Sequence, residues 1–410
     1  MTSARAQLRR DRRGEWFSQL SRVGSWQSLL AVPAAERERQ GYGHTLTEIL
    51  QQPLTWEDTA ADLRAQQAVL EGAVRALGEG SLFLTGSGSS VYAGECVALA
   101  LQRSMNLPVY AVPAGLLLTH AEAVVPRERP CLLVSLARSG NSPESCGAVD
   151  SLLAGDTMCH HLIVTCNAAG RLATSYEREP RVSRIVLDES TNDKSLVMTS
   201  SFSNLVLAAR ALGLVFKPGA HERLARSLSA IAQKLLLTQS ESIASAARKP
   251  FRSAAFLGTG CRFGAARESS LKMLEMTEGH IAAIAESFLG LRHGPMSGIR
   301  PDTLVVCFLS SDRLARAYEA DLLRELHRKR LGLSKVIVGE SIPEDLVFDE
   351  DIVVECPGLA GVTDDDAPVI DVLVGQLLAF FRSASQGVRP DAPSPDGVIS
   401  RVVENFEIHR

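Results

Sequence analysis

The fold is decided by FLTGSGSSVYAGECVALAL (residues 83–101) and FLGTGCRFGAARESSLKMLEM (residues 256–276), which are two versions of one pattern. In each, an apolar strand-like run leads through a glycine turn into a helical segment. Glycines let such a turn bend tightly and approach a ligand, and the start of the helix offers free N–H groups. The sequence therefore predicts an anion-binding turn at the same point of two similar units.

Strand-like runs rich in Val, Ile, Leu and Phe alternate with helical stretches around both turns. They are SLFLTG (81–86), CLLVSL (131–136), HLIVTC (161–166) and RIVLD (184–188), then AAFLGTG (254–260), TLVVCFL (303–309), KVIVGE (335–340) and DIVVEC (351–356). Matching runs are offset by about 172 residues, with the last pair about six closer, and come in the same order, which indicates a tandem duplication. The alternation predicts an α/β fold, with parallel sheets that carry helices on both faces.

The length of 410 residues allows two or three domains. We expect a helical extension over residues 1–45, two duplicated domains over 46–217 and 218–386, and a tail over 387–410. The tail is too rich in proline to be a helix.

The net charge of −4 argues against a nucleic-acid-binding protein. We interpret the basic cluster Arg9, Arg10, Arg12 and Arg13 as a solvated helix face. No apolar run reaches the roughly 18 residues of a membrane span, and the N-terminus lacks a signal-peptide core, so we expect a cytoplasmic protein with no membrane partner. The eight cysteines occur singly and read as core residues, which argues against a zinc site.

A dinucleotide-binding site is the first alternative for the glycine turns. The first turn has Gly86 and Gly88 but Val91 where a third glycine would fall, and in the second the glycine after Gly260 comes one position late. Neither half has the acidic residue expected at the end of the next strand. Both departures argue against a nicotinamide cofactor.

Hydroxyl side chains gather in two loops of the first half. Ser139 and Ser142 lie in ARSGNSPES (137–145), and Ser89 and Ser90 lie in the first glycine turn. In a parallel sheet both loops emerge at one edge, where hydroxyls and N–H groups can converge on a phosphate. An ordinary turn with a capped helix start fits the same residues and is compatible with an anion site. A nucleophilic serine lacks support, because no G-x-S-x-G elbow is present.

Charged side chains in the second half form another candidate group. Glu268, Lys272 and Glu275 share one face of the predicted helix, a spacing that a surface salt-bridge ladder would also have. His293 follows in a Gly-Pro turn, where packing gives no reason for an imidazole. Carboxylates placed beside a lysine and a histidine can take up and return a proton in general acid–base catalysis.

These segments resemble the tandem sugar isomerase (SIS) domains of the AgaS family, galactosamine-6-phosphate deaminase/isomerases formerly called tagatose-6-phosphate ketose/aldose isomerases. The resemblance covers residues 41–410. It implies a flavodoxin-like α/β sandwich in each domain, a phosphosugar substrate, and a homodimer or homotetramer with shared active sites. It is carried by TGSGSS (85–90), RSGNSPES (138–145), ESSLKMLEM (268–276), GLRHGPMS (290–297), GYGHTLTEILQQP (41–53), MTSSFSN (198–204) and HGPMSGIRPDTLVVCFLSSD (293–312).

The resemblance also implies roles for the charged residues. Glu275 takes the position of the base and His293 that of the group that opens the sugar ring. We expect Lys272 to offset the negative charge that develops on the enediol or enolamine oxygen, and Glu268 to orient Lys272 or a sugar hydroxyl. With these charges present, we expect no metal and no cofactor.

Two positions depart from the family pattern. Ala137 stands where the related glucosamine-6-phosphate synthase isomerase domain has a phosphate-binding serine. In the tail, Glu404 aligns with a lysine of that domain, and Arg401 is the nearest cation. The missing serine donor would be replaced by Arg138 or by the loop residues Thr199, Ser200 and Ser201.

The resemblance therefore implies an enzyme that converts D-galactosamine 6-phosphate to D-tagatose 6-phosphate and ammonia. A carboxylate would move a proton from C2 to C1 of the open-chain sugar, which gives a ketimine that water hydrolyses. A glucosamine-6-phosphate deaminase and an aldose-ketose isomerase that acts without deamination are alternatives. A non-catalytic phosphosugar-binding regulator is a further alternative, although no helix-turn-helix module accompanies the repeats.

Overall fold

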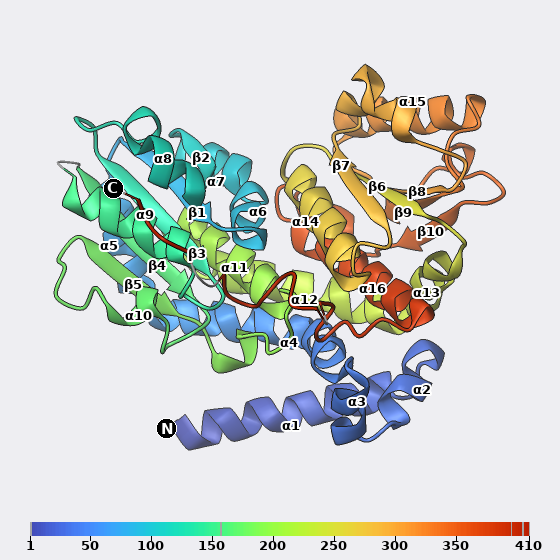
Figure 1. Cartoon of the computed structure of the whole chain (residues 1–410), viewed down its shortest axis with the longest axis horizontal. Coiled ribbons are helices and arrows are strands. Elements are labelled where there is room, and N and C mark those ends of the chain that lie inside the picture. The colour runs from blue at the N-terminus through green and yellow to red at the C-terminus, as the bar shows by residue number, and fades with distance from the viewer. Residues whose placement is uncertain (1, 156–157, 395, 404–405, 410) are drawn as a thin grey trace.

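The computed structural model describes residues 2–155, 158–394, 396–403 and 406–409, and it contains two five-stranded sheets (Figure 1). The first has the order β2-β1-β3-β4-β5 and the second the order β7-β6-β8-β9-β10, with all neighbours parallel. Each half thus has the flavodoxin-like order 2-1-3-4-5, which confirms the predicted fold class. The strands are β1 (Ser81–Gly86), β2 (Val109–Pro113), β3 (Cys131–Ala137), β4 (Cys159–Thr165), β5 (Val182–Val186), β6 (Ser253–Leu257), β7 (Ala282–Glu286), β8 (Thr303–Phe308), β9 (Ser334–Gly339) and β10 (Ile352–Glu355).

Helices cover both faces of each sheet (Figure 1). Two apolar clusters lie under the outer helices, and a third fills the space between the inner faces of the two sheets. The helices are α1 (Thr2–Leu20), α2 (Gly24–Ala31), α3 (Ala34–Gln40), α4 (Gly43–Ala65), α5 (Gln67–Leu77), α6 (Ser89–Glu95), α7 (Ala98–Met105), α8 (Ala114–Val124), α9 (Pro143–Ala154), α10 (Arg171–Thr174), α11 (Ser200–Ala211), α12 (Ala220–Thr238), α13 (Ser240–Arg248), α14 (Cys261–Met276), α15 (Arg313–Arg328) and α16 (Pro368–Gln386).

Each sheet contains one strand that the sequence analysis did not predict. These strands are β2 in the first half and β7 in the second. Both are five residues long and lie at a sheet edge. Several of their side chains are exposed, so the continuous apolar run of a buried strand is absent.

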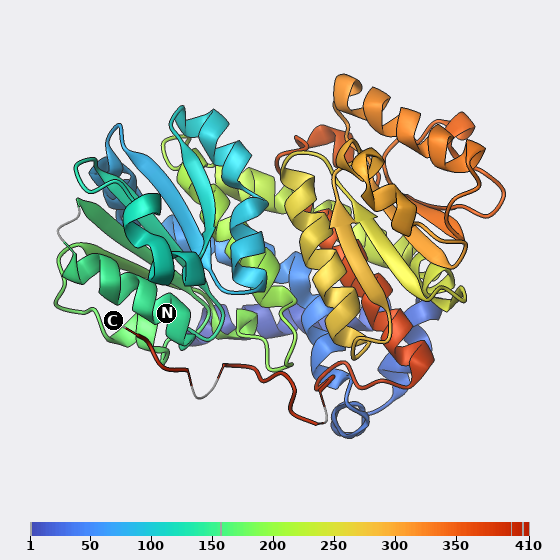
Figure 2. The same cartoon turned by 45° about the horizontal axis from the view of Figure 1, so that its top comes forward.

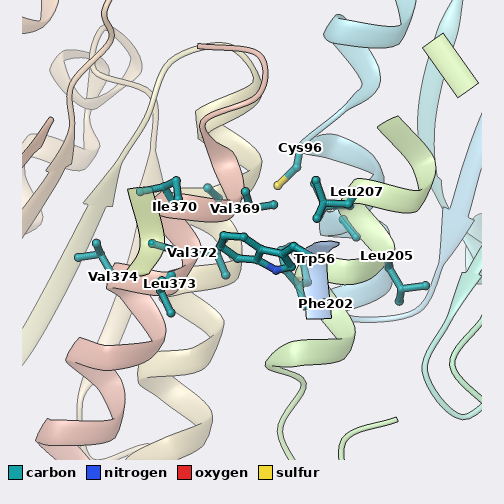
Figure 3. Packing of buried hydrophobic residues seen from close by; sticks show 14 of the residues in the cluster. Trp56, Cys96, Phe202, Leu205, Leu207, Val369, Ile370, Val372, Leu373 and Val374 are labelled. Atoms are coloured by element: carbon teal, nitrogen blue, oxygen red, sulfur yellow. The ribbon is translucent and has the colours of Figure 1, made fainter. Parts of the chain in front are cut away.

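The central core joins the two halves (Figure 3). The fully buried Trp56 of α4 lies among side chains that include Phe202 of α11 and Val372 of α16. Its indole Nε1 donates a hydrogen bond to Ser203 Oγ at 2.8 Å. Because α4 and α11 belong to the first half and α16 to the second, this core fixes the second half against the first sheet.

The glycine turns have the backbone that the sequence predicts. A Cβ on Gly86 would lie 2.4 Å from the Cβ of Ser90, and one on Gly258 would lie 2.3 Å from the carbonyl oxygen of Arg262. The second glycine of each turn, Gly88 or Gly260, has a φ of +56° or +61°. This left-handed region favours glycine, so both turns require it.

The helices that follow these turns, α6 and α14, pack against each other. A Cβ on Gly264 would lie only 2.7 Å from the backbone nitrogen of Cys96. Arg267 of α14 forms an ion pair with Glu95 of α6, and its guanidinium lies 4.4 Å from the ring centroid of Tyr92. This contact brings the acidic face of α14 to the edge of the first sheet.

The N-terminal helices pack on the chain itself. Arg9 forms an ion pair with Asp62 at 2.9 Å, and Arg12 forms one with Asp58 at 2.7 Å, both on α4. The interpretation of the basic cluster as a solvated face is therefore wrong for these two arginines, whereas Arg10 is exposed. Their partners lie about 50 positions away in the sequence, so local patterning could not reveal them.

The helix α16 is long and apolar enough to cross a membrane by length and composition. However, 78% of its apolar window is buried inside the fold. It is the helix that packs on both α13 and α14, so its composition is that of a core helix.

The tail after α16 crosses from the second half to the first (Figure 2). Asp391 accepts hydrogen bonds from the backbone nitrogens of His44 and Thr45, at 3.1 and 2.7 Å. Further along, Ile408 reaches Gly147 of α9, where a Cβ on that glycine would lie 2.6 Å from Ile408 Cδ1. The tail therefore passes over the carboxyl edge of the first sheet.

Candidate active site

A cavity of about 350 Å³ opens at the carboxyl edge of the first sheet, and we call it the cleft. It is bordered by the turn after β1, the loop after β3, the last turn of α14 and the tail. Of the predicted site residues, seven line it: Ser89, Ser90, Arg138, Ser139, Ser142, Glu275 and Arg401. The structure thus brings both hydroxyl loops and one carboxylate together.

The start of α9 faces the cleft as an anion-binding turn. Ser142 is its N-cap residue and Pro143 its first residue, but no side chain caps the helix. Ser139 Oγ accepts a hydrogen bond from the backbone nitrogen of Asn141 at 3.2 Å, and Gly140 between them has a φ of +65°. Hydroxyls and helix N–H groups arranged in this way suit a phosphate.

The equivalent turn in the second half is already occupied by a carboxylate of the same chain. After β8, the backbone nitrogens of Ser311 and Asp312 donate to Asp364 at 2.7 and 2.8 Å. Arg262, which is fully buried, pairs with Asp364 at 3.3 Å and with Asp371 at 2.6 Å. The duplicated edge is therefore satisfied internally, and the turn in the first half is the one that offers donors to a ligand.

Glu268, Lys272 and Glu275 lie on one face of α14, as the spacing predicts. Lys272 Nζ lies 3.3 Å from Glu268 Oε1, contacts Glu275 Oε2 and donates to Ser89 Oγ at 3.2 Å. Lys272 and Glu268 are fully buried and do not line the cleft, whereas the Glu275 side chain is 21% exposed and does. Glu275 is therefore the member of the group that a ligand can reach.

Burial sets the protonation of the two inner groups. Burial raises the pKa of Glu268 to about 8, against the lowering effect of Lys272. Burial lowers the pKa of Lys272, but the carboxylates of Glu268 and Glu275 outweigh it and the pKa lies above its ordinary value. Lys272 is thus a permanent positive charge directly behind Glu275.

Arg138 connects the cleft to the tail. The side chain is buried, and burial lowers the pKa of its guanidinium. It donates to the carbonyl oxygens of Leu196 at 2.7 Å, Ser195 at 3.2 Å and Arg401 at 3.1 Å. Arg138 therefore fixes the tail over the cleft as well as lining it.

Arg401 is bound to the same side of the cleft. Its guanidinium donates to Asn192 Oδ1 at 2.9 Å and to the carbonyl oxygen of Asp193 at 2.5 Å. Glu404, the other tail position considered, lies outside the described residues.

The loop of Thr199, Ser200 and Ser201 does not line the cleft. All three are buried, and Asp193 Oδ2 accepts from the backbone nitrogens of Thr199 and Ser201 at 2.7 and 2.8 Å, and from Ser201 Oγ at 2.5 Å. Within this chain the loop therefore does not reach the cleft where the missing serine donor would be needed: Asp193 accepts from three of its donors, and the buried Thr199 Oγ1 has no partner among the described residues. Nothing in the sequence distinguishes Asp193 from any other loop aspartate.

His293 ends a short 3-10 helix at Gly290–His293 and is exposed. It lines neither the cleft nor the neighbouring cavity, so the structure does not bring it to Glu275 within one chain. The neighbouring cavity, about 580 Å³, is also lined by Glu275, and it includes His280.

Sequence reasoning missed several residues of the cleft. Ser87 and Ser145 line it with their hydroxyl oxygens 3.4 Å apart, and both occur in the quoted segments. Leu196 and Met198 line it as well, from a segment next to the MTSSFSN stretch. Among the described residues, no group of three or more His, Cys, Asp or Glu side chains could hold a metal ion.

Glu48 of α4 supports the segment beside the cleft. Its Oε1 accepts from the backbone nitrogens of Lys194 and Ser195 at 2.6 and 3.3 Å, while its buried Oε2 has no hydrogen-bond partner among the described residues. Burial raises the pKa of Glu48 to about 8, and the Asp193 carboxylate adds to the rise.

Replacing Glu48 with glutamine is expected to make the free energy of unfolding less dependent on pH. The folded chain keeps this proton while the unfolded chain loses it, so the contribution is full below about pH 4.5 and falls as the pH rises to about 8. Urea unfolding of both proteins at pH 5 and pH 8 measures the difference. Glu38→Gln, an exposed change nearby, is the control, and equal pH dependence in Glu48→Gln and the wild type would contradict the assignment.

No protein-family model matches the chain, but curated relatives cover nearly all of it. A Streptomyces coelicolor protein provisionally named D-galactosamine-6-phosphate deaminase AgaS is 37% identical over 372 residues, which is 89% of this chain and 95% of that protein. The D-galactosamine-6-phosphate deaminase AgaS of Shewanella sp. (strain ANA-3) is 31% identical over 387 residues, 93% of this chain and 96% of that one.

Solved structures agree with these relatives. The crystal structure of tagatose-6-phosphate ketose/aldose isomerase from Escherichia coli matches with a TM-score of 0.81 and 30% identity. The match covers 90% of this chain and 96% of that one.

Proposed function

Because the chain belongs to the AgaS family of D-galactosamine-6-phosphate deaminases, we propose that it converts D-galactosamine 6-phosphate to D-tagatose 6-phosphate and ammonia. One observation carries the proposal. Glu275, partly exposed, lies in the same cleft as the uncapped start of α9 and next to the buried cation Lys272. A carboxylate that shares a cleft with a phosphate-binding turn can transfer a proton at the other end of a sugar phosphate.

The residues divide the chemistry between them. Ser89, Ser139 and Ser142 bind the phosphate with the N–H groups of α9. Glu275 takes the proton from C2 of the open-chain sugar and returns it to C1, which converts the amine-bearing aldose into a ketimine. Water then adds to C2, and ammonia leaves to give the ketose. Lys272 offsets the negative charge of the intermediate.

The purified full chain tests this assignment directly. We expect ammonia release from D-galactosamine 6-phosphate, with less from D-glucosamine 6-phosphate. Interconversion of D-tagatose 6-phosphate with its aldose, without ammonia release from either amine, would instead identify an aldose-ketose isomerase. The absence of both activities would leave a phosphosugar-binding protein.

We also propose that the chain acts as a homodimer or homotetramer whose subunits complete one another's sites. The support is that His293 is exposed and remote from the cleft of its own chain, although the resemblance assigns it to ring opening. Three apolar side chains are also exposed: Leu274 of α14, which lines the neighbouring cavity, Ile284 of β7, and Leu289 just after β7. A second copy would cover them.

Mixing two inactive variants is expected to restore activity if the sites are shared. Glu275→Gln and His293→Asn remove groups that would then come from different subunits. Random exchange of dimers forms hybrids in which one of the two sites is intact, so about a quarter of wild-type activity should return. A mixture that stays inactive after confirmed subunit exchange would place both groups in one chain.

We keep residues 46–217 and 218–386 as the proposed domains, and a cytoplasmic location as part of the proposal. The described cysteines are all free and buried, which fits a reducing compartment.

A further inference from the structure

A separate cavity of about 230 Å³ lies between the N-terminal helices and the segment 189–194. One face of α4, with side chains at positions 44, 47, 48 and 51, forms its wall. The segment continues directly into Leu196 and Met198, which line the cleft. Its lining residues are Arg13, Ala34, Arg37, Glu38, Gly43, His44, Thr47, Glu48, Gln51, Glu189, Ser190, Asn192 and Lys194.

Among the described residues, the basic side chains of this cavity form no direct ion pair with a carboxylate, although Arg13 is attracted by Asp58 and Asp188 and Arg37 donates to the carbonyl oxygen of Leu30 at 3.3 Å. The side chains of Arg13, His44 and Lys194 make no hydrogen bond or ion pair with any residue that the structure describes, and neither does the buried Nε of Arg37. Two neighbouring arginines of α1 differ from Arg13, because both are paired with carboxylates of α4. Arg9 lies one helical turn before Arg13, and Arg12 lies directly before it. The unpaired cations therefore gather where α1 faces this cavity.

Glu48 adds a second, independent observation. It is only 6% exposed and lines the cavity, and its Oε2 has no hydrogen-bond partner among the described residues. A buried polar atom normally has a partner, so this one is available to a group in the cavity. With its pKa raised to about 8 by burial, the carboxyl keeps its proton near neutral pH and can donate to an oxygen of a ligand.

We propose that this cavity is a second anion-binding site, which binds the phosphate group of a small phosphorylated metabolite through Arg13, Arg37 and Lys194. Three cationic side chains suit a phosphate dianion, and Glu48, Gln51 and Thr47 offer polar groups to the rest of the molecule. Two carboxylates, Glu38 and Glu189, also line the cavity and are exposed, as is Lys194. The site is distinct from the cleft and does not rest on the proposed activity.

The segment 194–196 connects this site to the cleft through hydrogen bonds on both sides. Glu48 binds the backbone nitrogens of Lys194 and Ser195, and the carbonyl oxygens of Ser195 and Leu196 bind Arg138. A ligand on Glu48 therefore contacts the segment that positions Arg138 and, through it, the tail.

Thermal unfolding of the full chain in rising inorganic phosphate, at ionic strength kept constant with sodium chloride, tests the proposal. An anion that binds the folded chain raises Tm with its concentration. Phosphate also enters the cleft, so the background is Ser139→Ala/Ser142→Ala. We expect a phosphate-dependent rise in Tm in this background and its loss when Arg13→Met and Lys194→Met are added.

Arg10→Met in the same background is the matched control, because Arg10 lies on α1 but is exposed and outside the cavity. It should keep the rise. Lys194→Met, added alone to the same background, should reduce the phosphate-dependent rise in Tm. Because Lys194 is exposed, this variant should fold even if the combined variant does not. A rise that survives Arg13→Met/Lys194→Met unchanged, or no rise in the background, would overturn the proposal. Ammonia release is measured separately, so failure of either proposal is distinguishable from failure of the other.

Discussion

Replacing Glu275 with glutamine is expected to lower kcat for ammonia release by about 10²–10⁴-fold, the usual contribution of a general base. The amide has the same shape and its oxygen can still accept from Lys272, so the packing of α14 should survive. What is lost is a group in the cleft that can take a proton from C2. Because the phosphate-binding serines are untouched, KM should change far less than kcat.

Glu278→Gln is the matched control for this experiment. Glu278 lies three residues further along, is exposed and does not line the cleft. It should retain wild-type kcat. If Glu275→Gln turned over at the wild-type rate, Glu275 would not be the base, and the non-catalytic reading of the fold would regain support.

The acidic face of α14 could be predicted from the sequence because helix geometry is local. Glu268, Lys272 and Glu275 share a face wherever the helix forms. Their burial could not be predicted, since the same spacing describes an exposed ladder. It depends on the contact of α14 with α6, which follows from Gly264 and from the common core around Trp56. Both contacts join elements that are distant in the sequence, so local patterning does not reveal them.

The arrangement of the phosphate-binding loops could likewise be predicted only in part from the sequence. The position of Ser139 and Ser89 at one sheet edge follows from a parallel topology, which the strand pattern indicates. The burial of residues 199–201 does not follow from the strand pattern. It depends on a single carboxylate, Asp193, which accepts hydrogen bonds from their backbone nitrogens. In the same way, Asp364 occupies the turn of the second half. An internal carboxylate and a free anion site look alike in sequence.

Replacing Lys272 with methionine is expected to destabilise the chain by about 3–5 kcal/mol, the usual cost of removing one partner from a buried ion pair. Methionine fills a similar volume, so the loss comes from charge rather than from a void. Above pH 8 the fully buried Glu268 is ionised, so it would lose the cation 3.3 Å away and have to take up a proton. Urea unfolding at pH 9 measures the difference in the free energy of unfolding, and this difference should shrink near neutral pH, where Glu268 keeps its proton.

The double variant Lys272→Met/Glu268→Gln separates stability from catalysis. It removes both members of a pair that is charged above pH 8, so at pH 9 it should recover most of the stability that Lys272→Met loses. Its activity should not recover, because no cation remains behind Glu275 to offset the charge of the intermediate. If the double variant were as unstable as Lys272→Met, the buried pair with Glu268 would not explain the loss. If it were active, Lys272 would be a structural cation only, and the charge on the intermediate would need another partner in the cleft, for which the buried Arg138 is a candidate.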